Sequence, residues 1–394
     1  MTETQLIEGL PTARSCPFDP PSKLGELRSQ SPISPLLYPD GHRGWLVTGD
    51  ELARVALTHP DLSSRQELRH SPVPFPVPPA PAPPGVFIGM DPPDHTRLRR
   101  PLSRAFTARR VRELEPAIAR ITRTCLDAME RQGPPAELMR SFALPLPVLV
   151  ISELLGASPE VAEEIQALRL PALLPGSSPQ EVGAAMQRTG EIFGELVAER
   201  RDQPGEDLLS TLIADGELND AELAGIAFLI LVAGHETTAN MIALSTWFLL
   251  DRPEARAALD LSAPLPEATA NELLRYLSPV QFTSRAALAD LELGGVKVRA
   301  GETVTLSIPA ANRDAARHSN AEEFHPDGSD ISSLAFGFGI HQCIGHNLAR
   351  AEIRIGVPEL LRRFPRLSVA APAESVATRE AMNTFGVHEL PVTW

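Results

Sequence analysis

Hydrophobic residues recur at helical spacing through most of this chain after residue 94. Apolar side chains repeat at positions i, i+3 and i+4, a period that places them on one face of a helix. The predicted helices cover residues 94–106, 108–130, 148–155, 159–168, 179–201, 208–214, 220–250, 253–259, 266–277 and 345–364.

Alternating apolar and polar positions are fewer and lie mainly late in the chain. They predict strands at residues 291–298 and 302–307, a strand pair around Trp45 and Val47, and an extended tail at 382–394. No internal repeat is visible. Because helices dominate and the strands cluster, the sequence predicts a mainly α fold with a small β portion, formed by a single domain over residues 1–394.

Two segments have unusual composition. Residues 225–250 are apolar enough to cross a bilayer, but His235 and Glu236 lie near the middle and no one-sided basic cluster flanks the segment, so we interpret it as a buried core helix. Residues 71–85 read SPVPFPVPPAPAPPG, and proline fixes φ and lacks an N–H group, which predicts an extended loop. This loop is either a surface linker or a semi-rigid cover over a pocket.

Charge and cysteine content narrow the function classes. The net charge of −14 argues against nucleic acid or an anionic membrane surface as the main partner. The three cysteines lie far apart in sequence, which indicates a reducing compartment, and their odd number disfavours a disulfide framework. They include no CxxC pair, which excludes a zinc ribbon or a thioredoxin-like motif. Met1 to Asp19 shows no basic stretch followed by an apolar run, so we expect no secretion signal and a cytoplasmic location.

Cys343 lies in the segment FGFGIHQCIG, residues 336–345, directly before a run of good helix formers. A position before a helix N-terminus lowers the pKa of a thiol and stabilises the thiolate. The glycines in the segment would let a flat, bulky group lie against the backbone. A structural cysteine in a glycine-rich turn is the alternative that these residues alone leave open.

The segment resembles the haem-binding signature of the cytochrome P450 superfamily, F-x-x-G-x-x-x-C-x-G. The resemblance implies that Cys343 is the axial iron ligand of haem b, with Phe336, Gly337 and Gly345 in the cofactor-binding loop. A thiolate ligand pushes electron density onto iron and favours O–O cleavage. The other two cysteines have no comparable context, and we interpret them as structural.

A second motif, AGHETT at residues 233–238, lies within the apolar helix. Glycine in a helix costs about 1 kcal/mol relative to alanine, and threonine can bond a preceding carbonyl and bend the helix, so we expect a small polar notch here. His235-Glu236 begins like the zinc motif HExxH, but position 239 is alanine, which excludes that site.

AGHETT also resembles the P450 pattern A/G-G-x-D/E-T-T. The resemblance implies catalytic roles for residues of this helix, which would face the haem from the side opposite the cysteine loop. Thr237 would steady the oxygen that is activated, and Glu236 would deliver protons through water. Ala233 and Gly234 complete the expected catalytic segment.

Glu272 and Arg275 lie on one helix face and resemble the family's E-x-x-R pair, which implies that they hold the cysteine loop. Two cations that the family usually adds are absent, because Gly328 stands at an arginine position and Ser333 at a histidine position. We hypothesise that backbone groups complete the pair, and that Gly328→Arg raises haem retention on heating.

The haem propionates need cationic partners. His95 and Arg99, one helical turn apart, resemble the family's H-x-x-x-R helix, and Arg285 and His341 match two further propionate contacts. A basic run surrounds the first pair, and it is either a solvated helix face or a docking patch for an acidic electron donor. The run consists of Arg97, Arg99, Arg100, Arg104, Arg109 and Arg110.

The resemblance extends from about Cys16 to Trp394 and is closest to soluble actinomycete P450s that hydroxylate macrolides and vitamin D-like molecules. It implies a monomeric monooxygenase, away from membranes, that inserts one oxygen atom from dioxygen into a bulky apolar secondary-metabolite-type small molecule. Ferredoxin and ferredoxin reductase would supply the electrons, and the proline-rich loop would cover the pocket. The expected pocket residues are Phe87, Ile88, Val232, Ala233, Val280, Phe282 and Thr384.

Two other functions stay open at this stage. A P450-type oxidase would couple, cyclise or desaturate a biosynthetic intermediate without inserting oxygen. A haem-thiolate sensor would bind without turnover, although the intact Glu236-Thr237 pair argues against it.

Overall fold

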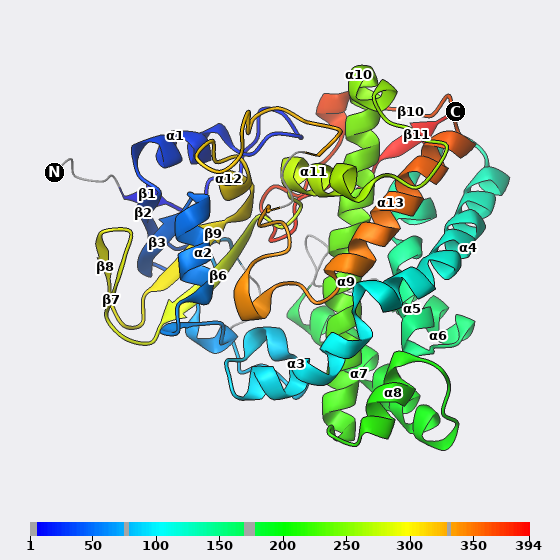
Figure 1. Cartoon of the computed structure of the whole chain (residues 1–394), viewed down its shortest axis with the longest axis horizontal. Coiled ribbons are helices and arrows are strands. Elements are labelled where there is room, and N and C mark those ends of the chain that lie inside the picture. The colour runs from blue at the N-terminus through cyan, green and yellow to red at the C-terminus, as the bar shows by residue number, and fades with distance from the viewer. Residues whose placement is uncertain (1–5, 75–78, 169–177, 329–331) are drawn as a thin grey trace.

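A computed structural model of the chain describes residues 6–74, 79–168, 178–328 and 332–394. The molecule has a helical side and a smaller sheet-rich side, formed by the N-terminal residues and the segment around residues 280–310 (Figure 1). This arrangement confirms the predicted mainly α fold with a small β portion.

The predicted helices are present, with ends that differ by a few residues. α6 falls within the predicted bounds, and most differences reflect terminal turns that carry no periodic signal. The observed helices are α3 (Asp94–Ala105), α4 (Ala108–Gln132), α5 (Pro145–Leu155), α6 (Pro159–Leu168), α7 (Pro179–Asp202), α8 (Leu208–Asp215), α9 (Asp220–Asp251), α10 (Pro253–Ala257), α11 (Glu267–Leu277) and α13 (His346–Arg363).

Short helices escaped the sequence analysis. They are α1 (Ser22–Gln30), α2 (Asp50–Thr58), α12 (Ile308–Asn312) and a π-helical turn, Met139–Ala143. α2 buries Ala53, Ala56 and Leu57, a spacing that fits one helix face. The signal was therefore present in α2, but it extends over little more than two turns.

The main sheet has six strands in the order β1-β2-β3-β9-β6-β4. β3 (Arg43–Val47) pairs antiparallel with β2 (Ile33–Leu37) and parallel with β9 (Thr303–Ser307), which confirms the predicted strand pair and the strand near 302–307. The predicted strand 291–298 is a hairpin, β7 (Leu291–Leu293) and β8 (Val296–Val298), with glycines at positive φ between them. The other strands are β1 (Ile7–Glu8), β4 (Leu62–Ser63), β5 (Ala136–Glu137), β6 (Phe282–Ala287), β10 (Ser368–Val369) and β11 (Pro391–Thr393).

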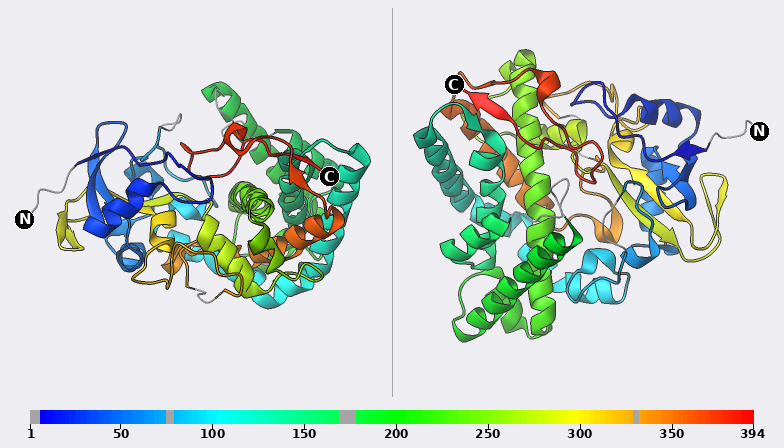
Figure 2. Two further views of the ribbon diagram at one scale, coloured as in Figure 1. Left: turned by 90° about the horizontal axis from the view of Figure 1, so that it is seen from above. Right: turned by 180° about the vertical axis from the view of Figure 1, so that it is seen from behind.

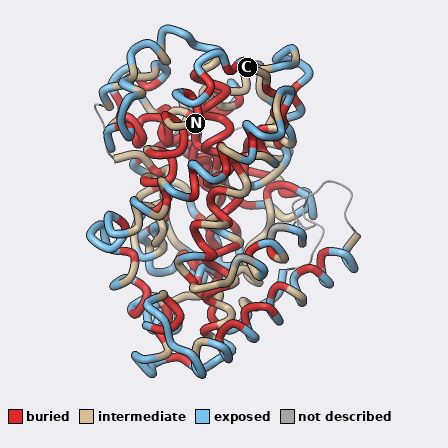
Figure 3. The backbone as a smooth tube through the Cα atoms, turned by 90° about the vertical axis from the view of Figure 1, so that its right-hand side faces the viewer, coloured by how far each residue is buried: buried red, intermediate tan, exposed pale blue. Residues whose placement is uncertain are grey.

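α9 is the central helix of the molecule, and the view from above looks along it between the sheet-rich side and the outer helices (Figure 2). Asn219 and Glu222 close its first turn with a reciprocal capping box. It contacts α5, α7 and α13, and buried residues run along the centre of the molecule (Figure 3). α9 is long and apolar enough to cross a membrane, but 72% of its most apolar window is buried in the protein, as expected of a core helix.

The end of the proline-rich segment rests directly on α9. A Cβ added to Gly225 would lie 1.8 Å from the Pro84 carbonyl oxygen, and one added to Gly85 would lie 2.3 Å from the Glu222 carbonyl oxygen. Residues 79–84 form no helix or strand, as expected, while residues 75–78 lie outside the described residues. This contact places the segment before Phe87 against the central helix and supports the cover interpretation.

Gly225→Ala should destabilise the protein although alanine is the better helix former. The added methyl group overlaps the Pro84 carbonyl, and forced overpacking typically costs about 1–3 kcal/mol. Gly190→Ala in α7 is the matched control, because a Cβ there meets nothing within 4 Å and should stabilise the helix. Thermal unfolding followed by circular dichroism would show opposite shifts, and parallel gains in both variants would contradict the tight contact.

Candidate active site

The loop that carries Cys343 is fixed by backbone geometry and by two cation–ring contacts. The Cys343 N–H donates to the Phe336 carbonyl at 2.8 Å, and Gly337 and Gly339 adopt φ values of +69° and +74° that favour glycine. The guanidinium of Arg350 lies 4.8 Å from the Phe336 ring centroid, and that of Arg54 lies 4.9 Å from the Phe338 ring. The loop thus holds its shape before α13 begins at His346.

Cys343 is an exposed residue, yet the surrounding protein desolvates its thiol. Desolvation raises its pKa, while the Gly345 N–H and the charges of Arg99 and Arg350 lower it to a smaller extent. The backbone N–H before α13 lowers the thiol pKa as expected, but burial outweighs this effect, so the net shift in the protein alone is upward.

AGHETT lies in α9, which is helical throughout residues 220–251. The Thr237 hydroxyl donates to the Ala233 carbonyl at 2.8 Å, as expected for a threonine in a helix. A Cβ on Gly234 would lie 2.8 Å from Ile151 Cδ1, so close packing of α5 explains the mid-helix glycine. Ala233 is exposed and its neighbours Val232 and Gly234 are half-buried. His235 is buried, and its Nδ1 contacts the Leu231 carbonyl at 2.9 Å.

Glu236 forms a buried ion pair that the sequence did not reveal. Its Oε1 accepts a hydrogen bond from Nη2 of Arg379, and both side chains are about a tenth exposed or less, at 10% and 8%. Burial raises the pKa of Glu236, and the Arg379 charge opposes that rise.

Basic side chains predicted from separate motifs meet beside the cysteine loop. The His95 and His341 rings lie 4.1 Å apart, and Arg99 donates to the Gln342 carbonyl. Burial and neighbouring positive charges lower the pKa of His341 to about 3, and burial lowers that of Arg285 to about 10.

Glu272 and Arg275 form a fully buried, bidentate pair with both distances at 2.7 Å. Backbone carbonyls of Asn312, Ala321 and Glu323 accept the other Arg275 hydrogen bonds at 2.7–3.0 Å. The His325 N–H donates to Glu272 at 2.8 Å. The structure thus agrees with the hypothesis that backbone groups complete this network, and a satisfied network of this kind is rigid.

Comparisons with known proteins agree with this geometry. A family model described as cytochrome P450 matches residues 262–393. Cytochrome P450 105C1 of a Streptomyces species is 44% identical, with 97% of each chain covered. Vitamin D3 dihydroxylase of Streptomyces griseolus is 37% identical, with 100% of this chain and 98% of the relative covered. The solved structure of CYP105P1 in complex with filipin I has a TM-score of 0.89 at 39% identity, covering 98% of this chain and 99% of that chain.

The chain belongs to the cytochrome P450 superfamily. It is an oxidoreductase of the monooxygenase type, related to soluble actinomycete P450s, and the family implies a haem-iron cofactor.

The residues of this P450 fit such a cofactor. Neither ring nitrogen of His95 has a hydrogen-bond partner among the described residues, although the side chain is buried. Arg285 is likewise buried, and among its neighbours the Asp91 carboxylate is the acid that opposes its desolvation. Unpaired basic groups out of water are costly, so the cluster has room for additional negative charge, which propionates carry.

Sequence reasoning missed Arg69, a further member of this cluster. Its Nη1 donates to the Ser284 carbonyl at 3.2 Å, and its buried Nε has no partner among the described residues. Burial lowers its pKa, and its charge lowers the pKa of Arg285 and His341. Residue 69 carries no local motif, and only the fold brings it to β6.

The geometry at position 328 argues against the expected benefit of arginine there. Gly328 has a φ of +61°, and an added Cβ would lie 2.3 Å from the Ala268 carbonyl oxygen in α11. The chain runs so close to α11 that no side chain fits. The loop path differs from one that presents an arginine, and the backbone carbonyls on Arg275 are consistent with that path.

The expected pocket residues lie in different surroundings. Val280 and Thr384 form an isolated β-bridge, and Asn383 Nδ2 donates to the Phe282 carbonyl at 2.9 Å, so these segments are adjacent. Phe87 is buried with its ring 6.0 Å from that of His95, beside the basic cluster. Ile88 is 52% exposed. Val232 is half-buried in α9.

The basic run on α3 and α4 is largely paired within the chain. Arg97 contacts Glu222 at 2.5 Å, and Arg100 contacts Glu217 at 3.0 Å. Arg104 lies 3.9 Å from Asp215. Glu113 forms ion pairs with both Arg109 and Arg110. Exposed pairs of this kind are weak, so they compete with a partner without excluding one.

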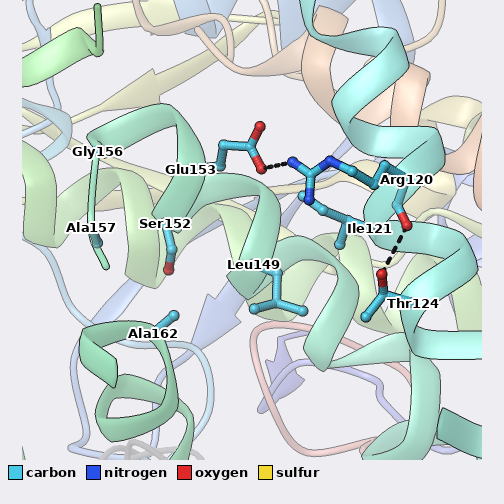
Figure 4. Close-up of a pocket in the computed structure, with 9 residues that line it drawn as sticks. All are labelled: Arg120, Ile121, Thr124, Leu149, Ser152, Glu153, Gly156, Ala157 and Ala162. Atoms are coloured by element: carbon cyan, nitrogen blue, oxygen red, sulfur yellow. Dashed lines mark hydrogen bonds and ion pairs between the residues drawn. The ribbon is translucent and has the colours of Figure 1, made fainter. Parts of the chain in front are cut away.

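A separate cavity of about 390 Å³ lies between α4, α5 and α6 (Figure 4). Its lining includes the Arg120–Glu153 ion pair together with Leu149 and Ala162. None of the residues predicted for the active site lines this cavity. It therefore has no part in the chemistry described above.

Gly328→Arg should lower thermal stability and haem retention. The substitution combines a left-handed backbone with overlap against α11, whereas Gly295→Arg has a similar φ of +79° and nothing within 4 Å. The left-handed conformation alone costs about 1–2 kcal/mol, so the loss at 328 should exceed that at 295. Thermal unfolding of both variants measures the difference, and improved haem retention in Gly328→Arg would contradict this placement.

Proposed function

We propose that this P450 is a haem b monooxygenase, one domain over residues 1–394, with Cys343 as the axial iron ligand. The observation that carries the proposal is that one loop holds the exposed residue Cys343 and also brings His341 against the buried ring of His95 and near the buried Arg285. Bound haem would supply dioxygen activation, and the remaining chemistry depends on how this chain holds and surrounds it.

The cysteine loop would bind the haem iron, and the basic cluster would bind the haem propionates. Phe336, Gly337 and Gly345 shape the loop around the thiol, and a Cβ on Gly345 would meet Cys343 Sγ at 4.0 Å. The cluster would bind the propionates by charge-assisted hydrogen bonds. Its members are Arg69, His95, Arg99, Arg285 and His341.

α9 would serve the oxygen side. The small side chain of Ala233, which is exposed, would leave space for a close approach, while Gly234 lets the helix pack against Ile151. The Thr237 hydroxyl, which donates to Ala233, keeps its oxygen available as an acceptor. Glu236 would move protons through water, which suits a carboxyl whose pKa burial has raised.

The substrate class is inferred from the expected pocket and from the named relatives. The residues at 87, 88, 232, 280 and 282 are apolar, and Thr384 is the polar exception. One relative is named for vitamin D3, and one neighbour structure holds filipin I. A bulky, mostly apolar secondary-metabolite-type molecule is the substrate that we propose.

This enzyme would act as a cytoplasmic monomer. A ferredoxin with its reductase would deliver the electrons to it. An acidic partner could exchange its carboxylates for those that now pair with Arg100 and Arg104, since surface pairs contribute little. Electrostatic steering would then speed the encounter.

Cys343→Ser should abolish the absorption band typical of thiolate coordination in the reduced carbon monoxide complex. Serine cannot supply the thiolate that the proposal requires, so the complex would lose that band. Cys16→Ser is the control, because that half-buried thiol lies in another part of the fold and should leave the spectrum unchanged. A normal thiolate band in Cys343→Ser would overturn the proposed ligand and with it the proposed function.

Arg69→Leu should have opposite effects on the haem-free and haem-loaded protein. Without haem, removal of one buried positive charge relieves repulsion on Arg285 and raises the unfolding temperature. With haem, loss of a hydrogen bond to a charged group, about 1.5–3 kcal/mol, speeds haem transfer to a scavenger globin roughly tenfold or more. Arg65→Gln, an exposed residue paired with Glu67, should change neither quantity. A stabilising or neutral effect in both forms would remove Arg69 from the cofactor site.

A further inference from the structure

The C-terminal hairpin, residues 378–387, carries Arg379 to the oxygen side of the protein. An isolated bridge joins Thr378 and Val387, and the Arg379 N–H donates to the Gly386 carbonyl at 3.0 Å. The tip is tied to the segment before β6, since the Phe385 N–H donates to the Pro279 carbonyl at 2.7 Å. Arg379 therefore extends from a backbone that is fixed on both sides.

This hairpin docks on α9 one turn after Glu236. A Cβ added to Gly386 would lie 1.8 Å from Asn240 Oδ1, so only glycine permits this approach. Asn240 Nδ2 donates in turn to the Glu236 carbonyl at 2.9 Å. The docking contact and the ion pair thus involve adjacent turns of the same helix.

Arg379 and Glu236 contact each other in a buried setting, while Nε of Arg379 has no partner among the described residues. We propose that Arg379 is a positioning residue that holds the Glu236 carboxylate on the C-terminal hairpin, so that proton delivery by Glu236 requires this contact to open. The inference rests on the proposed role of Glu236 as the acid of the oxygen side.

Opposing effects act on the Glu236 carboxyl. Desolvation raises its pKa and the Arg379 charge lowers it, so loss of Arg379 must raise the pKa further. Among the described residues, His235 on α9 and His388 on the C-terminal segment also sense the Arg379 charge. Glu380 follows Arg379 in the chain, and its charge acts on Arg14. Burial and the Arg379 charge both lower the pKa of His235 and His388, so these side chains favour the neutral form.

Substrate binding could influence the Glu236–Arg379 contact through the C-terminal hairpin. A carboxylate held by a guanidinium is a poor proton donor, since an efficient acid needs a pKa near the working pH. Thr384, an expected pocket residue, lies on the same hairpin and bridges to Val280. A substrate that presses on Thr384 therefore acts on the element that carries Arg379.

The test compares haem-loaded wild type with two neutral variants, Arg379→Gln and Arg379→Met, and with Arg379→Lys, which keeps the charge. Infrared titration of the protonated carboxyl band gives the midpoint of Glu236, after subtraction of an Arg379-matched Glu236→Gln reference. The subtraction removes Glu352, a second buried acid whose pKa burial raises to about 8. A neighbouring opposite charge shifts a carboxyl by about 1–3 units, so both neutral variants should titrate higher by that amount.

Arg379→Lys should titrate close to wild type, and Glu380→Gln on the same hairpin is the control that should leave the midpoint in place. Uncoupled dioxygen consumption, driven by NADPH, a ferredoxin reductase and a ferredoxin, should show the same upward shift in its pH profile. Unchanged midpoints in Arg379→Gln and Arg379→Met would overturn the inference about Arg379 alone. If instead Glu236→Gln consumed dioxygen with the wild-type pH profile, the proposed acid itself would be wrong.

Discussion

Positive charge held away from water is the constraint on which the active site depends. Arg69 and Arg285 are desolvated side by side, and their charges help to keep His341 neutral. The Asp91 carboxylate opposes this charge but is already bound by the Ser63 hydroxyl and the Ser64 N–H, at 2.5 and 2.8 Å. A bound dianion would relieve the repulsion, and a group that binds only the folded state stabilises it. In the proposed haem site, cofactor retention and fold stability would therefore depend on the same side chains.

Close backbone contacts hold the surrounding loops where this chemistry needs them. Three glycines allow such close contacts. The Pro84 carbonyl lies against Gly225, the Asn240 side chain against Gly386, and the Ala268 carbonyl against Gly328. Each contact joins segments that are distant in sequence, and each excludes any side chain at the glycine. Rigid attachment of this kind lets loop residues keep catalytic geometry without long secondary structure.

The sequence predicted what local motifs encode and missed what the fold brings together. Cys343, Glu236 and the Glu272–Arg275 pair stand in recognisable patterns, and the long helices have clear periods. β6 was missed because its residues FTSRAA are almost all buried, which removes the alternation that marks a strand. Arg379 lies 143 residues from Glu236 and carries no pattern of its own.

The direction of a pKa shift or of a substitution's effect was harder to predict from the sequence than the position of a functional residue. The Cys343 thiol was expected to have a lowered pKa from its place before α13, but desolvation depends on atoms that no local pattern specifies. Gly328 looked like a missing cation, whereas the chain path leaves no space for one. The direction of a pKa shift, and whether a side chain fits, depend on every group around a residue. A sequence motif specifies only the neighbours along the chain.

The basic cluster beside the cysteine loop and the Glu236–Arg379 pair differ in their balance of charge. This difference suits the first to binding a cofactor and the second to controlling a step of the reaction. Around the cysteine loop, basic groups outnumber acids, and this excess of positive charge would favour a bound anion. At α9, Glu236 and Arg379 form a matched ion pair without such an excess of charge, and in our proposal this pair changes state when the contact opens. An excess of one charge is suited to holding a cofactor, whereas a matched buried pair is suited to a step that must occur only at the right time.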